Sequence, residues 1–116
     1  MWRGDIYLID PDPVRGHESN KTRPCVIVSN NNANQMAQTL GRGVVTVVPI
    51  TSNVKSVYPF QVYLDRSDTG LDFDSKAQAE QVRSVDVRRL VARIGRVPFA
   101  QMVELDRVLK LHLALA

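Results

Sequence analysis

The chain has 116 residues, of which 44% are hydrophobic and 23% are charged, values that exclude a disordered chain, a collagen-like repeat and a disulfide scaffold. A formal net charge of +3 is too small by itself to indicate a nucleic-acid partner. The length suits a single domain over residues 1–116, and a domain of this size often completes an apolar face with a partner, which favours a dimer.

Short apolar segments separated by Gly, Pro, Asn and Asp clusters predict a mainly β fold with the strand spacing of a small barrel. The first predicted strand spans 5–9, and the polar stretch 10–22 after it is too long for a hairpin turn, which makes it a candidate functional loop. The strand predicted over 23–29 is nearly all apolar and is expected in the middle of the sheet. Residues 30–38 predict a short helix with Asn30 as its N-cap.

The second half of the chain continues this pattern of short strands. β-branched residues over 44–50 predict another central strand, with Pro49 at its end or at a free edge. Alternation of apolar and polar residues over 60–65 predicts a half-exposed antiparallel strand, with Gln61 on the exposed side. These two strands are expected to form a hairpin around the loop 51–59.

The chain is expected to close with a strand and an amphipathic helix. Residues 75–79 are expected to be extended, 80–84 to turn and 90–97 to form the last strand. A helix is expected from Pro98 onward. Its two apolar stripes, which serve more than one contact and support a homodimer, are Phe99, Met102, Leu105, Leu109 and Leu113 in one, and Val108, Leu111 and Leu115 in the other.

Charge is distributed unevenly along the chain. No acidic residue occurs over 19–64, a basic run of arginines occupies 83–96, and an acidic stretch over 65–74 separates the two. This asymmetry favours a positive groove for a polyanion, with solvated charge on a strand edge as the alternative.

Cys25 is the only cysteine, so no internal disulfide is expected. It lies in an apolar run, which predicts a buried thiol in a protein of a reducing compartment. The first residues lack an apolar signal core, and no segment approaches the roughly 18 apolar residues needed to span a bilayer. We therefore expect a cytoplasmic protein with no membrane contact.

Residues that could bind a metal or a cofactor are sparse. His17, His112 and Cys25 lack the spacing of metal ligands, and the aspartates over 65–74 lack the glycine and closing glutamate of a calcium loop. No Gly-rich phosphate-binding motif occurs, so neither metal nor cofactor is expected. His112, late in the last helix, is expected to be structural. His17, beside Glu18 in the long polar loop, is either an RNA contact or an exposed loop residue.

Polar and turn residues recur at the expected strand ends in a fixed order. They are Gly16-His17-Glu18, Arg23-Pro24, Asn30, Pro49-Ile50-Thr51-Ser52, Tyr58-Pro59-Phe60 and Ala79-Glu80-Gln81-Val82-Arg83-Ser84. In this order they resemble the MazF/PemK/Kid family of toxin ribonucleases, whose pattern has a Gly-x-Glu loop, an Arg-Pro strand start and a Pro-x-Thr strand end. The segments 3–7 and 94–97 also match, so the resemblance covers roughly residues 2–113.

This resemblance implies an SH3-like barrel with added helices that dimerises and cuts single-stranded RNA without a metal. It implies attack of a 2′-hydroxyl on the adjacent phosphate, giving a 2′,3′-cyclic phosphate and a 5′-hydroxyl end. The catalytic arginine and threonine of the family correspond to Arg23 and Thr51. The resemblance further implies an RNA groove at the dimer interface and a MazE-like antitoxin with an acidic, disordered tail that competes for the groove.

The chemistry of the two candidate catalytic residues agrees with this role. Arg23 can offer a planar fork of donors to a phosphate, and Thr51 can donate its hydroxyl to the same oxygens. A guanidinium stays protonated at pH 7, so we interpret Arg23 as a stabiliser and leave the proton acceptor open between Glu18 and His17. The structural alternatives are pairing of Arg23 with an aspartate and a backbone hydrogen bond from Thr51 at its strand end.

Further residues are expected to contact RNA through the same resemblance. Ser52 and Asn53 extend the loop beside Thr51, and His17 stands where the family commonly has serine, which puts the cleavage-site preference in doubt. The expected base readers are Glu18, Asn30, Ser75, Glu80 and Gln81. The expected phosphate contacts, with surface charge as the alternative, are Lys55, Lys76 and Arg83.

Two other functions fit the same architecture. A DNA gyrase poison like CcdB shares the fold without nuclease activity. Such proteins end in a functional tail with an aromatic residue, whereas residues 113–116 contain none. An RNA-binding barrel without catalysis is the third interpretation, and only Arg23 with Thr51 argues against it.

Overall fold

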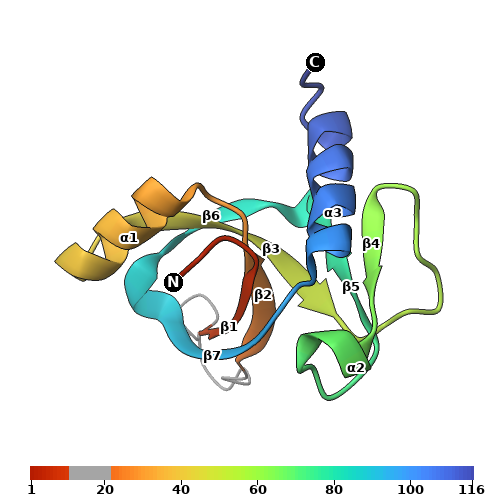
Figure 1. Ribbon diagram of the computed structural model, residues 1–116, viewed down its shortest axis with the longest axis horizontal. Coiled ribbons are helices and arrows are strands. Elements are labelled where there is room, and N and C mark those ends of the chain that lie inside the picture. The colour runs from red at the N-terminus through yellow and green to blue at the C-terminus, as the bar shows by residue number, and fades with distance from the viewer. Residues whose placement is uncertain (11–21) are drawn as a thin grey trace, which may run out of the picture.

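The computed structural model describes residues 1–10 and 22–116, which form a mainly β fold with added helices (Figure 1). The strands are β1 (Asp5–Ile9), β2 (Arg23–Ile27), β3 (Val44–Thr51), β4 (Gln61–Leu64), β5 (Ser75–Gln78), β6 (Arg83–Asp86) and β7 (Leu90–Arg96). The helices are α1 (Asn31–Leu40), α2 (Arg66–Thr69) and α3 (Phe99–His112), with short 3-10 turns η1 (Ala79–Gln81) and η2 (Val87–Arg89).

The strands form one antiparallel, seven-stranded sheet in the order β4-β5-β3-β2-β1-β7, with β6 also paired to β3. β4 and β7 are the two ends of this path in the described chain, so the sheet that forms the predicted small barrel does not close on itself. The mainly β class and the C-terminal helix are confirmed. α3 packs against β4, which places a helix over the core instead of a further strand pairing.

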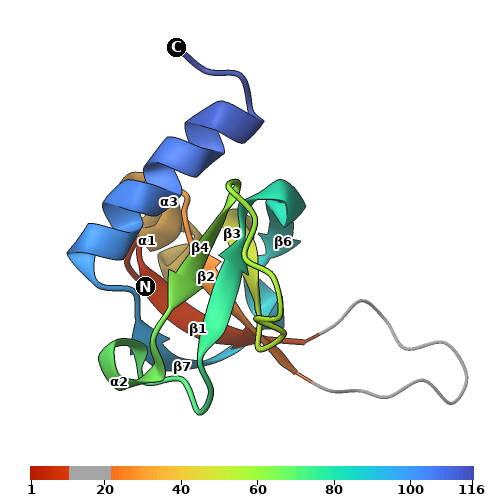
Figure 2. The same ribbon diagram turned by 90° about the vertical axis from the view of Figure 1, so that its right-hand side faces the viewer.

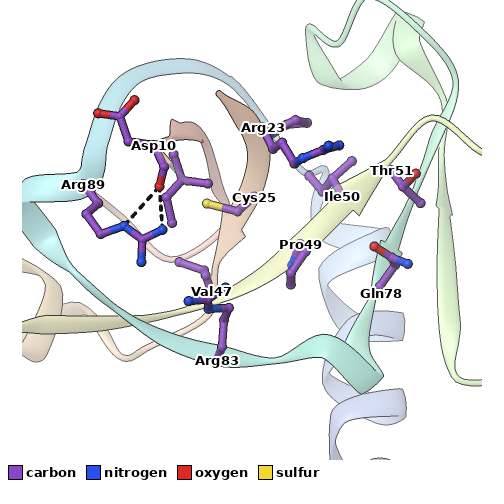
Figure 3. Close-up of a pocket in the computed structure, with 12 residues that line it drawn as sticks. Asp10, Arg23, Cys25, Val47, Pro49, Ile50, Thr51, Gln78, Arg83 and Arg89 are labelled. Atoms are coloured by element: carbon purple, nitrogen blue, oxygen red, sulfur yellow. Dashed lines mark hydrogen bonds between the residues drawn. The ribbon is translucent and has the colours of Figure 1, made fainter. Parts of the chain in front are cut away.

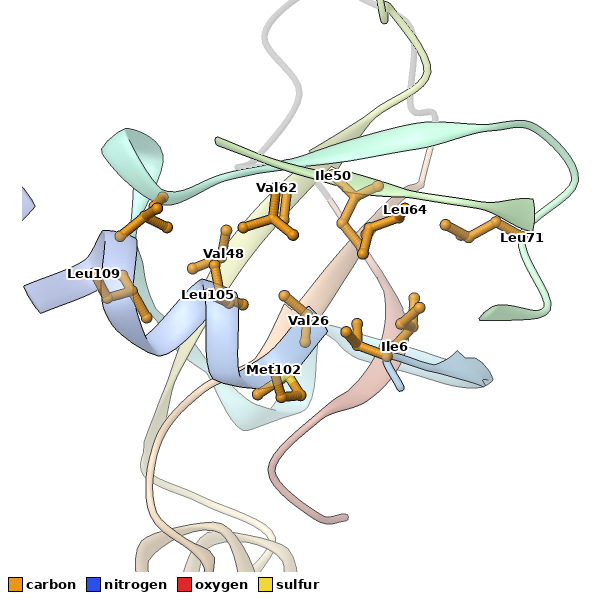
Figure 4. Close-up of a cluster of buried hydrophobic side chains, with 14 residues drawn as sticks. Ile6, Val26, Val48, Ile50, Val62, Leu64, Leu71, Met102, Leu105 and Leu109 are labelled. Carbon is orange, nitrogen blue, oxygen red and sulfur yellow. The ribbon is translucent and has the colours of Figure 1, made fainter. Parts of the chain in front are cut away.

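The central strands bury both faces, as their continuous apolar sequence predicts. Val26 in β2 packs into the larger core beneath α3 (Figure 4), whereas its neighbours Cys25 and Ile27 point into a smaller core that includes Ala37 of α1. This alternation follows from the two-residue period of a strand. The thiol of Cys25 is therefore buried, as expected.

The predicted hairpin between β3 and β4 is wrong, because β5 lies between these strands. Ala77 of β5 pairs with Ile50 on one side and with Val62 on the other, and all three side chains are buried in the larger core. Two strands adjacent in sequence therefore share a partner instead of pairing with each other.

The sequence does not predict the strand β6 or the helix α2. The predicted turn over 80–84 holds only in part, because η1 turns and β6 then begins at Arg83 and pairs with the first half of β3. In the acidic stretch, Asp65 caps α2 by accepting a hydrogen bond from the Ser67 amide at 2.8 Å.

Pro49 lies within β3 instead of at its end. It pairs with Cys25 on one edge of β3, and on the other edge it falls between the residues paired with β5 and those paired with β6. η1 separates β5 from β6 at this position, so neither of these strands pairs with Pro49 on that edge of β3. The N–H group that proline lacks therefore removes no hydrogen bond between strands.

The last helix divides its apolar residues between the core and the surface. Met102, Leu105, Val108 and Leu109 are buried, whereas Phe99 is 83% exposed and Leu111, Leu113 and Leu115 are also exposed. His112 lies exposed in the last turn of α3. Over residues 1–10 and 22–116, no helix combines the length and the apolar character needed to cross a membrane.

Candidate active site

The candidate site lies where β2 begins and β3 ends. These strands are antiparallel, with Cys25 opposite Pro49, and extending that register by two residues sets Arg23 opposite Thr51. Directly opposed residues of an antiparallel pair place their side chains on the same face of the sheet. The fold therefore brings the two predicted catalytic residues together from separate strands.

Both residues line a pocket of about 320 Å³ (Figure 3). The pocket occurs at the interruption between β5 and β6, where Gln78 and Arg83 flank η1. Its polar lining comes from four strands and two adjoining segments: Asp10, Arg23, Thr51, Gln78, Arg83 and Arg89. Three arginines in one pocket make it suited to a phosphate group.

A second pocket of about 250 Å³ adjoins the first, because Arg23, Pro24, Ile50 and Thr51 line both. The remaining lining of the second pocket is Leu8, Thr22, Ser52, Leu71, Asp72, Phe73, Ser75 and Ile94. Arg23 and Thr51 thus lie between a cationic pocket and one that offers polar and aromatic groups.

The Arg23 side chain is exposed, and no carboxylate in the described part of the chain forms an ion pair with it. The described residues therefore do not show the alternative role of Arg23, which is pairing with an aspartate. Arg23 lines two adjoining pockets.

The Thr51 hydroxyl oxygen accepts a hydrogen bond from the Asn53 amide at 3.2 Å. The structural alternative for this residue, a backbone contact at the strand end, is thus present. It is compatible with catalysis, because a hydroxyl that accepts from an amide keeps its own hydrogen for donation to a substrate oxygen.

Arg89 is a pocket residue that the sequence does not single out. Its Nε and Nη2 atoms donate to the carbonyl oxygen of Asp10 at 3.0 and 2.6 Å, which holds the guanidinium at the pocket (Figure 3). The basic run over 83–96 is the only signal that could have found it, and it does not distinguish Arg89 from its neighbours. Arg83, a predicted phosphate contact, lines the same pocket.

Cys25 also lines this pocket but is not suited to nucleophilic chemistry. Burial raises the pKa of its thiol to about 12, so the thiol is neutral at physiological pH. It contributes packing to the wall of the pocket.

Three of the predicted RNA contacts are engaged inside the chain. The buried Ser75 hydroxyl donates to the Phe73 carbonyl at 2.8 Å, and Glu80 Oε2 accepts from Gln61 Nε2 at 2.8 Å. Lys76 is only 7% exposed, and its Nζ donates to the Ser56 carbonyl at 2.6 Å. These contacts give the three side chains internal partners.

The other predicted RNA contacts are distributed around the molecule. Asn30 lies beyond the far end of β2 from Arg23 and caps α1, since its Oδ1 accepts from the Ala33 amide at 2.8 Å. Ser52, Asn53, Lys55 and Gln81 are exposed, and of these Ser52 lines the second pocket. His17 and Glu18 lie outside the described residues.

Within residues 1–10 and 22–116, no three His, Cys, Asp or Glu side chains converge in a way that could hold a metal ion. The polar groups that line the pocket are three guanidinium groups, a hydroxyl and an amide, beside the Asp10 carboxylate. The guanidinium, hydroxyl and amide donors of this set can stabilise negative charge on oxygen atoms.

Comparison with known proteins identifies the family of this chain. The family model for the PemK-like, MazF-like toxin of type II toxin–antitoxin systems matches residues 2–113. The chain is 57% identical to Endoribonuclease MazF9 of Mycobacterium tuberculosis, over 99% of this chain and 98% of that protein. It is 35% identical to Endoribonuclease MazF of Staphylococcus epidermidis, over 97% and 91% of the two chains.

Solved structures share the fold of this chain. A mycobacterial endoribonuclease in complex with its cognate antitoxin has a TM-score of 0.79 at 24% identity, covering 100% of this chain and 97% of that one. A MazE–MazF crystal structure from Deinococcus radiodurans has a TM-score of 0.80, with the same identity and coverage. The family model over residues 2–113 and the 57% identity to a MazF endoribonuclease show that the chain belongs to the PemK-like, MazF-like family of toxins from type II toxin–antitoxin systems.

Proposed function

We propose that this protein is a toxin that acts as a sequence-selective endoribonuclease on single-stranded RNA and needs no metal. The observation that carries the proposal is the meeting of Arg23 and Thr51 in one open pocket, from two antiparallel strands. The name endoribonuclease, given to the two relatives described above, supports the same reaction class.

The proposed reaction is an internal phosphoryl transfer. The 2′-hydroxyl of one nucleotide attacks the adjacent phosphorus, and the bond from phosphorus to the 5′ oxygen breaks. The 2′-hydroxyl loses its proton and the departing 5′ oxygen gains one, so the products are a 2′,3′-cyclic phosphate and a 5′-hydroxyl end. The protein must stabilise the negative charge that grows on the non-bridging oxygens.

Arg23 and Thr51 supply that stabilisation. The guanidinium can donate two parallel hydrogen bonds to the phosphate, and the Thr51 hydroxyl has its hydrogen available because its oxygen accepts from Asn53. Arg83 and Arg89 add positive charge to the same pocket, where they attract the RNA backbone. Glu18 and His17 remain the candidates for the proton acceptor.

The exposed residues beside the pocket extend the proposed RNA-binding surface. Ser52, Asn53 and Lys55 follow Thr51 directly, and Gln81 lies in η1 at the interruption beside the pocket. We do not include Lys76 and Ser75 among the direct RNA contacts, because both side chains are buried and hydrogen-bonded within the chain.

The proposal includes two partners. The exposed apolar side chains of α3, with Phe99 at its start, support a homodimer. The cationic pocket suits the acidic tail of a MazE-like antitoxin, which would compete with RNA for the same arginines. We place the activity in the cytoplasm because the proposed substrate is cellular RNA.

The test is cleavage of a pool of single-stranded RNAs by the purified protein in excess EDTA. We expect cuts at a restricted set of sites, each leaving a cyclic phosphate and a 5′-hydroxyl. A single 2′-deoxy nucleotide at a cut site should abolish cleavage there and leave binding unchanged, because the nucleophile is missing. The Arg23→Ala variant, purified in parallel, controls for a contaminating nuclease.

The two alternatives predict other outcomes of the same experiment. RNA binding without cleavage would support a non-catalytic RNA-binding barrel. Absence of both, together with inhibition of DNA gyrase in a supercoiling assay, would support the CcdB-like alternative.

A further inference from the structure

The segment 52–60, between β3 and β4, folds back over the face of the sheet that carries Thr51. Thr51 pairs with Lys76 of β5, which in turn pairs with Tyr63 of β4, so these three side chains start on one face. Alternation predicts that this face is exposed, yet Lys76 and Gln61 are each only 7% exposed. The covering segment runs beside β4 and β5 (Figure 2).

Lys76 holds the middle of this segment. Its Nζ donates to the Ser56 carbonyl at 2.6 Å and lies 5.4 Å from the centre of the Tyr58 ring. The Tyr58 ring in turn stacks on Phe60, with 5.5 Å between ring centroids. A carbonyl oxygen and an aromatic face are the groups that stabilise a cation removed from water.

Gln61 holds the end of the segment. Its Oε1 accepts from the Tyr58 amide at 3.1 Å, and its Nε2 donates to Glu80 Oε2 at 2.8 Å. Glu80 thereby fixes which way the Gln61 amide faces, since only the nitrogen can donate to a carboxylate.

The segment held in this way orients the Thr51 hydroxyl. The Asn53 amide donates to Thr51 Oγ1, and Asn53 is itself fixed because its Oδ1 accepts from the Lys55 amide at 3.3 Å. Lys55 immediately precedes Ser56, where Lys76 binds. The contacts therefore form a continuous path from the ammonium of Lys76 to the hydroxyl of Thr51.

A buried cation is costly, and an apolar side chain of the same length would fill the space without that cost. The position of Lys76, directly opposite Thr51, gives a reason for its presence. We propose that Lys76, with Gln61 and Glu80, is a positioning residue for the ribonuclease reaction: it clamps segment 52–60 so that the Asn53 amide holds the Thr51 hydroxyl for donation to the phosphate. This inference rests on the proposed function and assigns Lys76 and Glu80 a role other than RNA contact.

The first test needs no RNA. In Lys76→Met, which keeps the length of the side chain and removes the charge, amide hydrogen exchange at Asn53 and Tyr58 should be at least about tenfold faster than in the wild type. The matched control is Lys110→Met, the same change at an exposed lysine of α3, where exchange at these amides should not move. Unchanged exchange in Lys76→Met would overturn the clamp even if the protein proves not to be a nuclease.

The second test separates positioning from substrate contact. Lys76→Met should lower kcat about tenfold with little change in KM, and Lys76→Arg should recover most of the loss. In a Thr51→Val background the same substitution should have less than about a twofold effect, because the hydroxyl it positions is gone. Direct RNA binding by Lys76 would instead raise KM in Lys76→Met and weaken the salt dependence of RNA binding by about one phosphate contact. That result would overturn the proposal.

If Lys76→Met does not fold, Tyr58→Leu tests the same clamp from the exposed segment, where no core residue changes. It removes the ring near the ammonium and should speed exchange at Asn53 and lower kcat in the same direction, by a smaller factor. Wild-type exchange at Asn53 together with wild-type kcat in this variant would contradict the proposal. If the wild type does not cleave RNA, the proposed function is contradicted, whereas the hydrogen-exchange test of the clamp still stands.

Discussion

Arg23 at the start of β2 and Thr51 at the end of β3 line the same two adjoining pockets. A phosphate held by both residues would leave space on either side for the flanking nucleotides of an RNA strand. The pocket toward Arg83 and Arg89 is cationic, and the pocket toward Phe73 and Asp72 offers an aromatic ring and acceptor oxygens. The arrangement is suited to a strand that crosses the site.

The role of the Thr51 hydroxyl can be isolated with two substitutions. Thr51→Val keeps the shape of the side chain and removes the donor, and kcat should fall on the order of a hundredfold, as expected for one donor to a growing charge. Thr51→Ser keeps the hydroxyl and should retain most of the activity. Single-turnover cleavage rates measure both, and equal rates for the valine and serine variants would exclude hydroxyl donation.

Gly95 is required for close contact between β7 and the end of α2. A Cβ at this position would lie 1.8 Å from the Thr69 carbonyl oxygen, far inside contact distance. Gly95→Ala should therefore lower the free energy of unfolding by about 3 kcal/mol or more, measured by urea denaturation.

Gly41→Ala is the matched control for that substitution. Gly41 has φ of 65°, and a Cβ at this position would meet no atom within 4 Å, so only the left-handed backbone is penalised. We expect a loss of about 1 kcal/mol. Equal losses for the two variants would show that α2 can move away from β7.

The raised pKa of Cys25 predicts both low reactivity and a dependence of stability on alkaline pH. The native thiol should resist alkylation at pH 8 and react only after unfolding. Because the thiol pKa rises from 9.0 in the unfolded chain to about 12 in the folded one, its contribution to stability is complete below pH 9 and is lost as the pH rises toward 12.

The comparison that isolates this effect is the difference in free energy of unfolding between the wild type and Cys25→Ala. The difference should be constant below pH 9 and should shrink above it, since the alanine variant has no thiol to ionise. A difference that is flat through about pH 11, or rapid alkylation of the native protein, would place Cys25 in an exposed environment.

The sequence predicts the central strands well because burial on both faces leaves an unbroken apolar run, as in β2. It does not reveal β6, where only Val85 of four residues is buried and the other side chains are polar. The partner of β3 is likewise hidden, because local alternation says which face of a strand is buried and not which strand lies beside it. That choice depends on distant contacts such as Ala77 with Ile50 and Val62.

The candidate site could also be predicted only in part from the sequence. Arg23 and Thr51 follow from the order of motifs, and the structure places them together. The environments of Lys76 and Gln61 could not be predicted, because alternation assigns both to an open face. Segment 52–60 covers that face, and nothing in its composition indicates where it folds back.

If the Arg23 guanidinium stabilises the phosphate during cleavage, its removal must slow the reaction itself. The single-turnover rate of Arg23→Ala in EDTA, measured beside RNA binding by the same variant, determines this. The side chain is exposed, so the variant should fold with an unchanged melting temperature. We predict a rate at least about a hundredfold below the wild type at saturating RNA, with little recovery in Arg23→Lys because lysine lacks the planar fork. Cleavage by Arg23→Ala at the wild-type rate would show that the Arg23 guanidinium does not stabilise the transition state.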